Sequence, residues 1–254
     1  MGGQALKQDT IILVVTSEAT WQNLDTYCLN EHFRQNRDRF DLAIVFNGTD
    51  EAALQKIKAV APEHLLVREN LGRDPGAFDA ALRALPVHEY EQTLFMHDDH
   101  WFDQPDWFDT LHALLEQRPE IDVFGNLVVA SVHAPPNYEG ICYSLGYHEY
   151  KLANFPYFLQ GMAGLFRKNA IDTLKRLGGV PHIHRNVVEV GQVCERLLSF
   201  ILLNEGHLMA QIPPGYEKYL IHHEHYKNGN SSSKPASRLS GIAKRLHRVL
   251  IRGR

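Results

Sequence analysis

The sequence predicts a doubly wound α/β domain with a largely parallel sheet and helices on both of its faces. Over the first half of the chain, short apolar runs alternate with segments of helical periodicity, which is the pattern of repeated βα units. The apolar runs are continuous rather than alternating with polar residues. This is expected of strands that are covered on both faces.

Four such runs are predicted strands, and the segments that follow them are predicted helices. The strands are residues 11–15, 42–46, 65–67 and 93–96, and the helices are residues 21–33, 54–60, 77–85 and 107–115. Residues 123–157 are rich in Gly, Pro, Tyr and Asn, and their pattern does not place the strands that we expect there. Helical periodicity returns at residues 187–201 and ends before Gly206, which is a helix stop signal.

The composition indicates a globular protein of the cytoplasm. Apolar residues make up 44% of the chain and charged residues 22%, close to the averages for soluble domains. No apolar run approaches the roughly 20 residues that span a bilayer, and the first ten residues lack a secretory apolar core. Three widely spaced cysteines form neither a disulfide framework nor a zinc quartet, which fits a reducing compartment.

The charge is distributed unevenly along the chain. Residues 227–254 hold eight Lys and Arg and no Asp or Glu, which leaves 18 basic and 30 acidic residues in 1–226. An acidic body of this kind does not suit nucleic-acid binding. We therefore expect a main domain over 1–226 and a separate basic tail over 227–254. Residues 228–237 (NGNSSSKPAS) have the composition of a flexible linker.

Residues 238–252 of this tail allow two interpretations. A charged chain end is commonly solvated and disordered. The apolar spacing of this segment, however, also suits an amphipathic helix lying on an anionic membrane surface, which would place the protein peripherally on the inner face of the membrane.

Polar residues follow each of the four predicted strands. They are Thr16 and Ser17, then Asn47 and Asp50, then Asn70, Gly72, Arg73 and Asp74, and last the segment from His97 to His100. Ligands of open α/β sheets bind at the carboxyl ends of the strands, so these residues predict a pocket of nucleotide size. Taken singly, Asp50 and Asp74 also fit helix N-caps, and Asn47 fits a turn.

The segment His97-Asp98-Asp99-His100 gives the sharpest signal. It places two adjacent carboxylates directly after a buried strand, where their repulsion is relieved if a cation joins them. Carboxylate oxygens suit Mg²⁺ or Mn²⁺, and Mg²⁺ often combines one or two carboxylates with substrate phosphates. A solvated loop with a helix cap is the alternative.

With these motifs in this order, the chain resembles the family 2-like glycosyltransferases of the GT-A fold, particularly those that build bacterial surface polysaccharides. The resemblance covers about residues 11–226. Residues 42–50 (LAIVFNGTD) are similar to the segment that meets the nucleobase and ribose, and residues 69–78 (ENLGRDPGAF) to the Asn-x-Gly segment along the donor. Residues 95–102 (FMHDDHWF) stand in place of the metal-binding Asp-x-Asp motif, and residues 158–167 (FLQGMAGLFR) look like the glycine-containing segment beneath the acceptor.

The resemblance implies roles for individual residues. The donor would be a nucleotide-diphosphate sugar and the acceptor a glycan or lipid-linked glycan, with inversion at the anomeric carbon. His97 replaces the first Asp of the metal motif, which leaves Asp99 as the expected ligand of Mn²⁺ or Mg²⁺ and Asp98 as a nucleotide contact. His97 and His223 are further candidate ligands, and Arg73 is a candidate partner of the donor diphosphate.

The catalytic base has two candidates. Glu195 follows Cys194 where the family carries an acidic pair, and Glu189 also fits the family spacing. Two other functions stay open at this point. A metal-dependent phosphohydrolase could be built from His97, Asp98, Asp99 and the late histidines, and a GT-A-like module could bind glycans without catalysis.

Overall fold

A computed structural model describes residues 8–131, 133–183, 188–213, 216 and 219–222. The described residues up to Ile221 belong to one compact unit. In this part of the chain the main sheet has the order β10-β6-β9-β4-β1-β2-β3. β9 is antiparallel to both of its neighbours, and the other pairings are parallel, so the sheet is the largely parallel one that the sequence predicts.

The strands of the main sheet are short to medium in length. They are β1 (Thr10–Ser17), β2 (Asp41–Asn47), β3 (His64–Arg68), β4 (Gln92–His97), β6 (Val123–Gly125), β9 (Gly164–Arg167) and β10 (Met209–Gln211). Two further pairs of strands lie outside the main sheet. They are β5 (His100–Trp101) with β11 (Ile221–His222), and β7 (Val128–Ala130) with β8 (Tyr157–Leu159).

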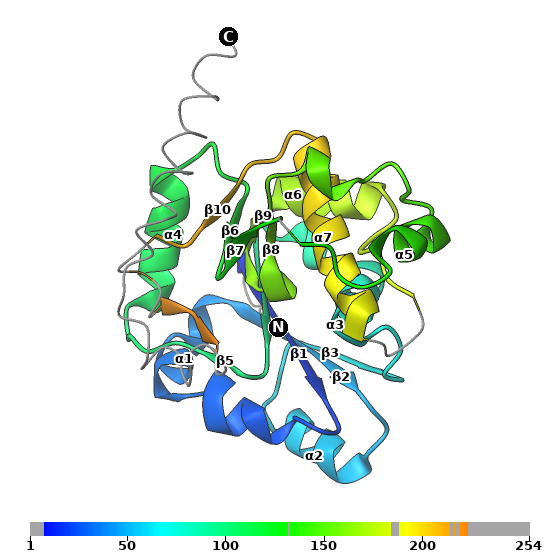
Figure 1. Ribbon diagram of the computed structural model, residues 1–254. Helices are drawn as coiled ribbons and strands as arrows, with labels where there is room; N and C mark the ends of the chain where they lie inside the picture. Colours follow the sequence, from blue (N-terminus) through cyan, green and yellow to red (C-terminus); the bar gives the residue numbers. More distant parts are fainter. Residues whose placement is uncertain (1–7, 132, 184–187, 214–215, 217–218, 223–254) are drawn as a thin grey trace, which may run out of the picture. The chain divides into compact units, whose positions relative to one another are not determined.

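Helices cover both faces of the sheet (Figure 1). One face carries α1 (Glu31–Gln35), α2 (Glu51–Ala59) and α4 (Trp107–Gln117). The other carries α3 (Arg73–Ala84), α6 (Lys168–Arg176) and α7 (Val188–Asn204), and α5 (Tyr138–Leu145) packs on α7. Successive β1 residues divide between the two cores, Ile12 and Val14 facing one and Leu13 and Val15 the other. This two-sided burial is why the strands read as continuous apolar runs.

The four predicted strands and the helices at residues 54–60, 77–85, 107–115 and 187–201 are confirmed, with shifted ends. The predicted helix at residues 21–33 is wrong as a single element. A π-helical turn, Leu24–Cys28, precedes α1, and Asn30 separates them. The Asn30 side chain accepts a hydrogen bond from Phe33 N (3.0 Å) and donates one to Phe102 O (2.6 Å), so it starts a new helix.

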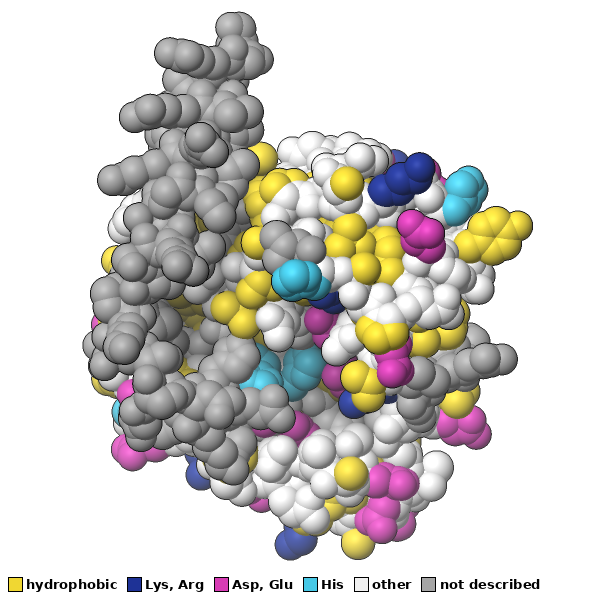
Figure 2. Space-filling view, viewed as in Figure 1, with side chains coloured by type: hydrophobic (Ala, Val, Ile, Leu, Met, Phe, Trp, Pro, Cys, Tyr) yellow, Lys and Arg dark blue, Asp and Glu magenta, His cyan; other side chains and the backbone are white. Residues whose placement is uncertain are grey.

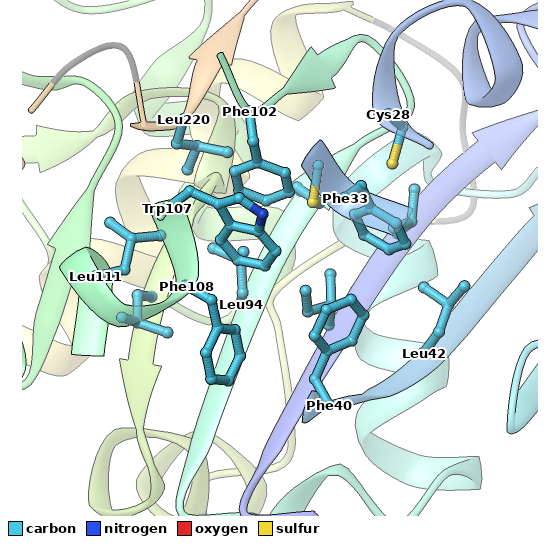
Figure 3. Close-up of a cluster of buried hydrophobic side chains, with 14 of the residues drawn as sticks. Cys28, Phe33, Phe40, Leu42, Leu94, Phe102, Trp107, Phe108, Leu111 and Leu220 are labelled. Carbon is cyan, nitrogen blue, oxygen red and sulfur yellow. The ribbon is translucent and has the colours of Figure 1, made fainter. Parts of the chain in front are cut away.

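An aromatic cluster fills the space between the sheet and the α1 and α4 helices (Figure 3). The Trp107 ring stacks on Phe102 with centroids 3.7 Å apart, and its indole Nε1 donates to His32 O at 3.0 Å. Phe102 follows the His97–His100 segment by two residues. The cluster therefore anchors the loop that carries the candidate metal motif.

Among the described residues, no helix is both long enough and apolar enough to cross a bilayer.

Candidate active site

The parallel arrangement brings the polar strand ends to one edge of the sheet. β4, β1, β2 and β3 are consecutive neighbours, and their register places Val15 beside His97, Ser17 beside Asn47, and Asn47 beside Arg68. Figure 2 shows histidine and acidic side chains near the centre of the face that this edge opens onto. The topology therefore brings these segments to one edge of the sheet, as the sequence predicts.

Asp98 is held inside this edge. Its side chain is 5% exposed, and Oδ2 accepts a hydrogen bond of 2.5 Å from Thr16 Oγ1. Burial raises the pKa of Asp98, hydrogen bonds from Thr16 and Thr20 lower it, and the nearby Asp99 raises it, giving a pKa of about 6. Asp98 thus fixes the end of β4 against the end of β1.

Asp99 lies in a group of three metal-type ligands. Asp99, His100 and His222 each offer one ligand atom, and these atoms lie within 4.8 Å of one another. Asp99 Oδ1 is 3.2 Å from His100 Nδ1, and the His100 side chain is 2% exposed. β5 carries His100 and pairs with β11, which carries His222. His223, the residue expected from the sequence, lies outside the described residues.

His97 has other partners. Its Nε2 lies 2.7 Å from Gly161 O, and its Nδ1 lies 3.6 Å from Asp74 Oδ2. Burial lowers the pKa of His97, but the negative charges of Asp74, Asp99 and Asp98 outweigh this effect, and the net pKa is raised. In this structure His97 ties the end of β4 to α3 and to the Gly161 turn rather than joining the group of Asp99.

Glu195 is linked to the same turn. It accepts a hydrogen bond from the Gly161 amide and is attracted by the His97 charge. Burial raises the pKa of Glu195, and the negative charge of Asp74 raises it further. The hydrogen bond from Gly161 and the positive charges of His97 and Arg196 lower this pKa. The effect of burial is the largest, and the net pKa of Glu195 is raised. The base candidate and the metal motif are therefore linked through one residue, because Glu195 contacts the amide of Gly161 and His97 contacts its carbonyl oxygen. Glu189 lies in the first turn of α7, six residues earlier, and so points to a different side of the helix.

Gly161 holds this link with a left-handed backbone, at φ +69°. A Cβ there would meet nothing within 4 Å, so the cost of Gly161→Ala is conformational, about 1 kcal/mol. We expect this variant to lose about that much unfolding free energy and, because its peptide group turns, to lose turnover as well. Urea unfolding and release of nucleoside diphosphate measure the two effects.

Gly206 provides the matched control for Gly161. Its φ is +88°, a Cβ there would also meet nothing within 4 Å, and it follows α7 beyond the active site. Gly206→Ala should lower stability by a similar amount and leave turnover unchanged. Equal turnover in both variants would contradict a functional role of the Gly161 turn.

The remaining predicted donor residues lie at the carboxyl ends of β1 and β2 and in the loops that lead to α2 and α3. Asn47 is 3% exposed, and its Oδ1 accepts from Arg68 Nη1 at 2.6 Å. Asp50 caps α2 through a 2.6 Å bond from Ala53 N. Ser17 Oγ lies 2.9 Å from Thr20 Oγ1.

The loop before α3 carries the other donor candidates. Asn70 and Arg73 are exposed, and Asp74 lies in the first turn of α3 rather than at its N-cap. Gly72 occupies the N-cap with φ +76°, and a Cβ there would lie 2.9 Å from Ile183 O. Glycine is therefore required at this position.

Glu18 is a further acidic residue at this edge of the sheet, which the sequence did not single out. Its carboxylate accepts hydrogen bonds from the amides of Thr49 and Asp50, the latter at 2.7 Å, and these two bonds lower its pKa. The contact exists because β1 and β2 are neighbours, which only the tertiary structure specifies. It places a carboxylate on the amide groups at the start of α2, where an anion is favoured.

A cavity of about 380 Å³ opens beside Glu195. Gln160, Gln192 and Arg196 line it together with apolar side chains that include Phe158. The Arg196 guanidinium lies over the Phe158 ring at 4.0 Å from its centroid. Volumes of about 300–1,000 Å³ are typical of small-molecule sites. A substrate in this cavity would lie against the base candidate.

No protein-family model and no curated protein sequence matches this chain. The structure is similar to PcManGT, a mannosyltransferase from Pyrobaculum calidifontis solved in complex with GDP-Man and Mn²⁺, with a TM-score of 0.51 and 14% identity over 83% of this chain and 56% of that one. Residues 1–349 of TarS from S. aureus are also similar, with a TM-score of 0.45 and 14% identity over 81% of this chain and 58% of that one.

This chain thus spans just over half the length of each of these structures. With a seven-stranded, mostly parallel sheet between two layers of helices, and with this structural similarity to PcManGT, the chain has the GT-A fold.

Proposed function

We propose that this chain is a metal-dependent glycosyltransferase that moves a sugar from a nucleotide-diphosphate donor to a hydroxyl group of a glycan or lipid-linked glycan acceptor. The main support for the proposal is that three features lie together at one edge of the sheet. They are the ligand group at Asp99, the turn at Gly161, and the cavity with Glu195. The similarity to a mannosyltransferase that binds GDP-Man and Mn²⁺ supports it at the level of the fold.

The ligand group fits a divalent transition metal ion. One carboxylate with two imidazoles is a donor set that Mn²⁺ accepts, whereas Mg²⁺ prefers oxygen ligands throughout. We therefore favour Mn²⁺ over Mg²⁺, held by Asp99, His100 and His222. When bound, the ion would neutralise negative charge on the leaving nucleoside diphosphate.

In the proposed reaction, Glu195 acts as the general base. Its carboxylate takes the proton of an acceptor hydroxyl whose oxygen attacks the anomeric carbon of the donor, and the bond to the diphosphate breaks. Attack from the side opposite the leaving group inverts the anomeric centre. Burial suits Glu195 to this role, because a raised pKa strengthens a carboxylate as a proton acceptor.

The donor would lie along the edge between β1 and α3. We assign its binding to Thr16, Ser17, Asn47, Asp50, Asn70, Gly72, Arg73, Asp74 and Asp98. In this assignment the residues with buried side chains, such as Asn47 and Asp98, shape the pocket, and the exposed Arg73 meets the diphosphate. Synthesis of a bacterial surface polysaccharide is the role that we expect, with the tail at residues 238–252 as the proposed membrane contact; this tail lies outside the described residues.

Titration with nucleotide sugars tests the proposal. UDP-glucose, UDP-N-acetylglucosamine, GDP-mannose and dTDP-rhamnose are each added with and without Mn²⁺, and binding is followed by calorimetry and by the shift in melting temperature. We expect at least one donor to bind and to require Mn²⁺. A ligand at 100 times its Kd raises the stability by about 2.7 kcal/mol, so the shift is measurable. Absence of Mn²⁺-dependent binding across the panel would refute the proposal.

One observation favours a second candidate function. A carboxylate and two imidazoles also suit a hydrolytic metal site. A metal-dependent phosphohydrolase would release phosphate from p-nitrophenyl phosphate and would show no preference for a nucleotide diphosphate. The same protein preparation, assayed on both substrate classes, separates the two functions.

A further inference from the structure

A second cavity borders the one at Glu195. Its volume is about 510 Å³, and Ala134 lines both cavities. α5 and the segment that follows it form its walls, with Tyr138, Tyr143, Tyr150 and Lys151 among the lining residues. The transfer reaction proposed above uses only the first cavity, so the second one has no role in it.

The lining combines aromatic rings with polar groups. Tyr143 is 76% exposed, which is unusual for so large a ring, and it lies beside His148 with ring centroids 6.3 Å apart. Glu139 and Lys151 add one charge of each sign. Pyranose sugars present apolar C–H faces and rims of hydroxyl groups, and a lining of flat rings and hydrogen-bonding side chains matches both. An acyl chain would instead need an aliphatic lining without charges.

Two residues that line the cavity, Tyr138 and Tyr150, are connected by contacts to the helix of Glu195. Tyr138 Oη donates to Tyr150 O at 2.7 Å, and the Tyr150 ring stacks on Phe155 with an interplanar angle of 16°. Phe155 stacks on Phe200 of α7 at 4.3 Å between centroids. Figure 2 shows hydrophobic side chains over α5 and α7, with charged and histidine side chains near the edge of that area. A ligand here would therefore have a fixed position relative to Glu195.

We propose that this second cavity is an outer acceptor subsite, which binds sugar residues that precede the acceptor sugar at Glu195. The inference rests on the proposed transferase function and specifies its substrate class: the acceptor is an oligosaccharide rather than a monosaccharide. One sugar lies in the cavity with Glu195, and the next lies across Ala134, with its apolar face on Tyr143.

The test uses defined glycans and two variants of an exposed residue. The protein is applied to an array of gluco-, manno-, galacto- and N-acetylglucosamine oligosaccharides, each series running from one to six sugars. We expect one series to be retained only from the disaccharide or trisaccharide upwards. In Tyr143→Ala the affinity for that series should fall about tenfold, equivalent to about 1.4 kcal/mol, whereas Tyr143→Phe, which keeps the ring, should bind as the wild type does.

The outcomes distinguish this inference from the transferase proposal, because Mn²⁺-dependent donor binding is measured on the same proteins. Donor binding should be equal in wild type, Tyr143→Ala and Tyr143→Phe. Equal retention of mono- and oligosaccharides, no retained series, or undiminished binding by Tyr143→Ala would each overturn the outer subsite. Chain-length-dependent glycan binding without donor binding would uphold the cavity as an oligosaccharide site but refute the transferase, and with it the role of the bound glycan as an acceptor.

Discussion

Replacing Asp99 with alanine is expected to weaken Mn²⁺-dependent donor binding by about 100-fold or more. Changes to residues that only orient metal ligands already cost about 10–100-fold, and Asp99 is the sole carboxylate of the described ligand group. Binding of Mn²⁺ alone, followed by electron paramagnetic resonance of the free ion, should weaken in parallel. This second measurement does not depend on activity or on the identity of the donor.

Asp109→Ala is the matched control for Asp99→Ala. Asp109 lies on α4 in an exposed ion pair with Arg39, at 2.5 Å, and we expect its loss to change stability by about 1 kcal/mol at most and metal binding not at all. If Asp99→Ala binds Mn²⁺ and donor as tightly as Asp109→Ala does, the proposed metal site is refuted.

Glu195→Gln should retain donor binding and lose turnover by a factor of about 10²–10⁴. The amide keeps the size of the side chain but cannot accept the proton of the acceptor hydroxyl, and general base catalysis contributes about this factor. Calorimetry of the donor with Mn²⁺ measures the first property, and release of nucleoside diphosphate measures the second. Glu189→Gln, made on the same helix, should keep both properties. If Glu195→Gln instead keeps full turnover and Glu189→Gln loses it, Glu189 is the catalytic base.

The pH dependence of turnover gives a second measure of Glu195. Its pKa is raised, chiefly by burial, and the base must be unprotonated to act. Turnover should therefore fall on acidification at a pH above about 4.3, the ordinary pKa of a glutamate, and the residual activity of Glu195→Gln should lack this acid limb. Saturating donor and Mn²⁺ keep the protonation of metal ligands out of the measurement. If the activity of Glu195→Gln still falls on acidification in the same pH range, the titrating group is not Glu195.

The central part of the chain shows where prediction from the sequence reaches its limit. β6, β9 and β10 contain three or four residues each, and so short a run carries no periodicity of its own. β9 is also antiparallel to its neighbours, which a rhythm of repeated βα units does not indicate. β9 pairs with β4, β6 pairs with β9, and β10 pairs with β6, so the positions of these strands follow from contacts between residues far apart in the sequence.

The sequence by itself determined the parallel half of the sheet and the edge at which the site lies. Each of β1, β2 and β4 has a continuous apolar run followed by polar residues, and this signal is local. Because parallel strands end at the same edge, the clustering of Thr16, Asn47 and Asp98 follows from the strand assignment alone.

Only the tertiary structure decided which of the polar residues contact one another. His97 meets Gly161 across 64 positions of sequence, and Glu195 joins them from α7. The sequence placed His97 and Asp99 in one motif, but their side chains contact different partners. Such contacts depend on how loops and helices pack around the edge of the sheet, and side-chain packing leaves no periodicity in the sequence from which a partner could be identified.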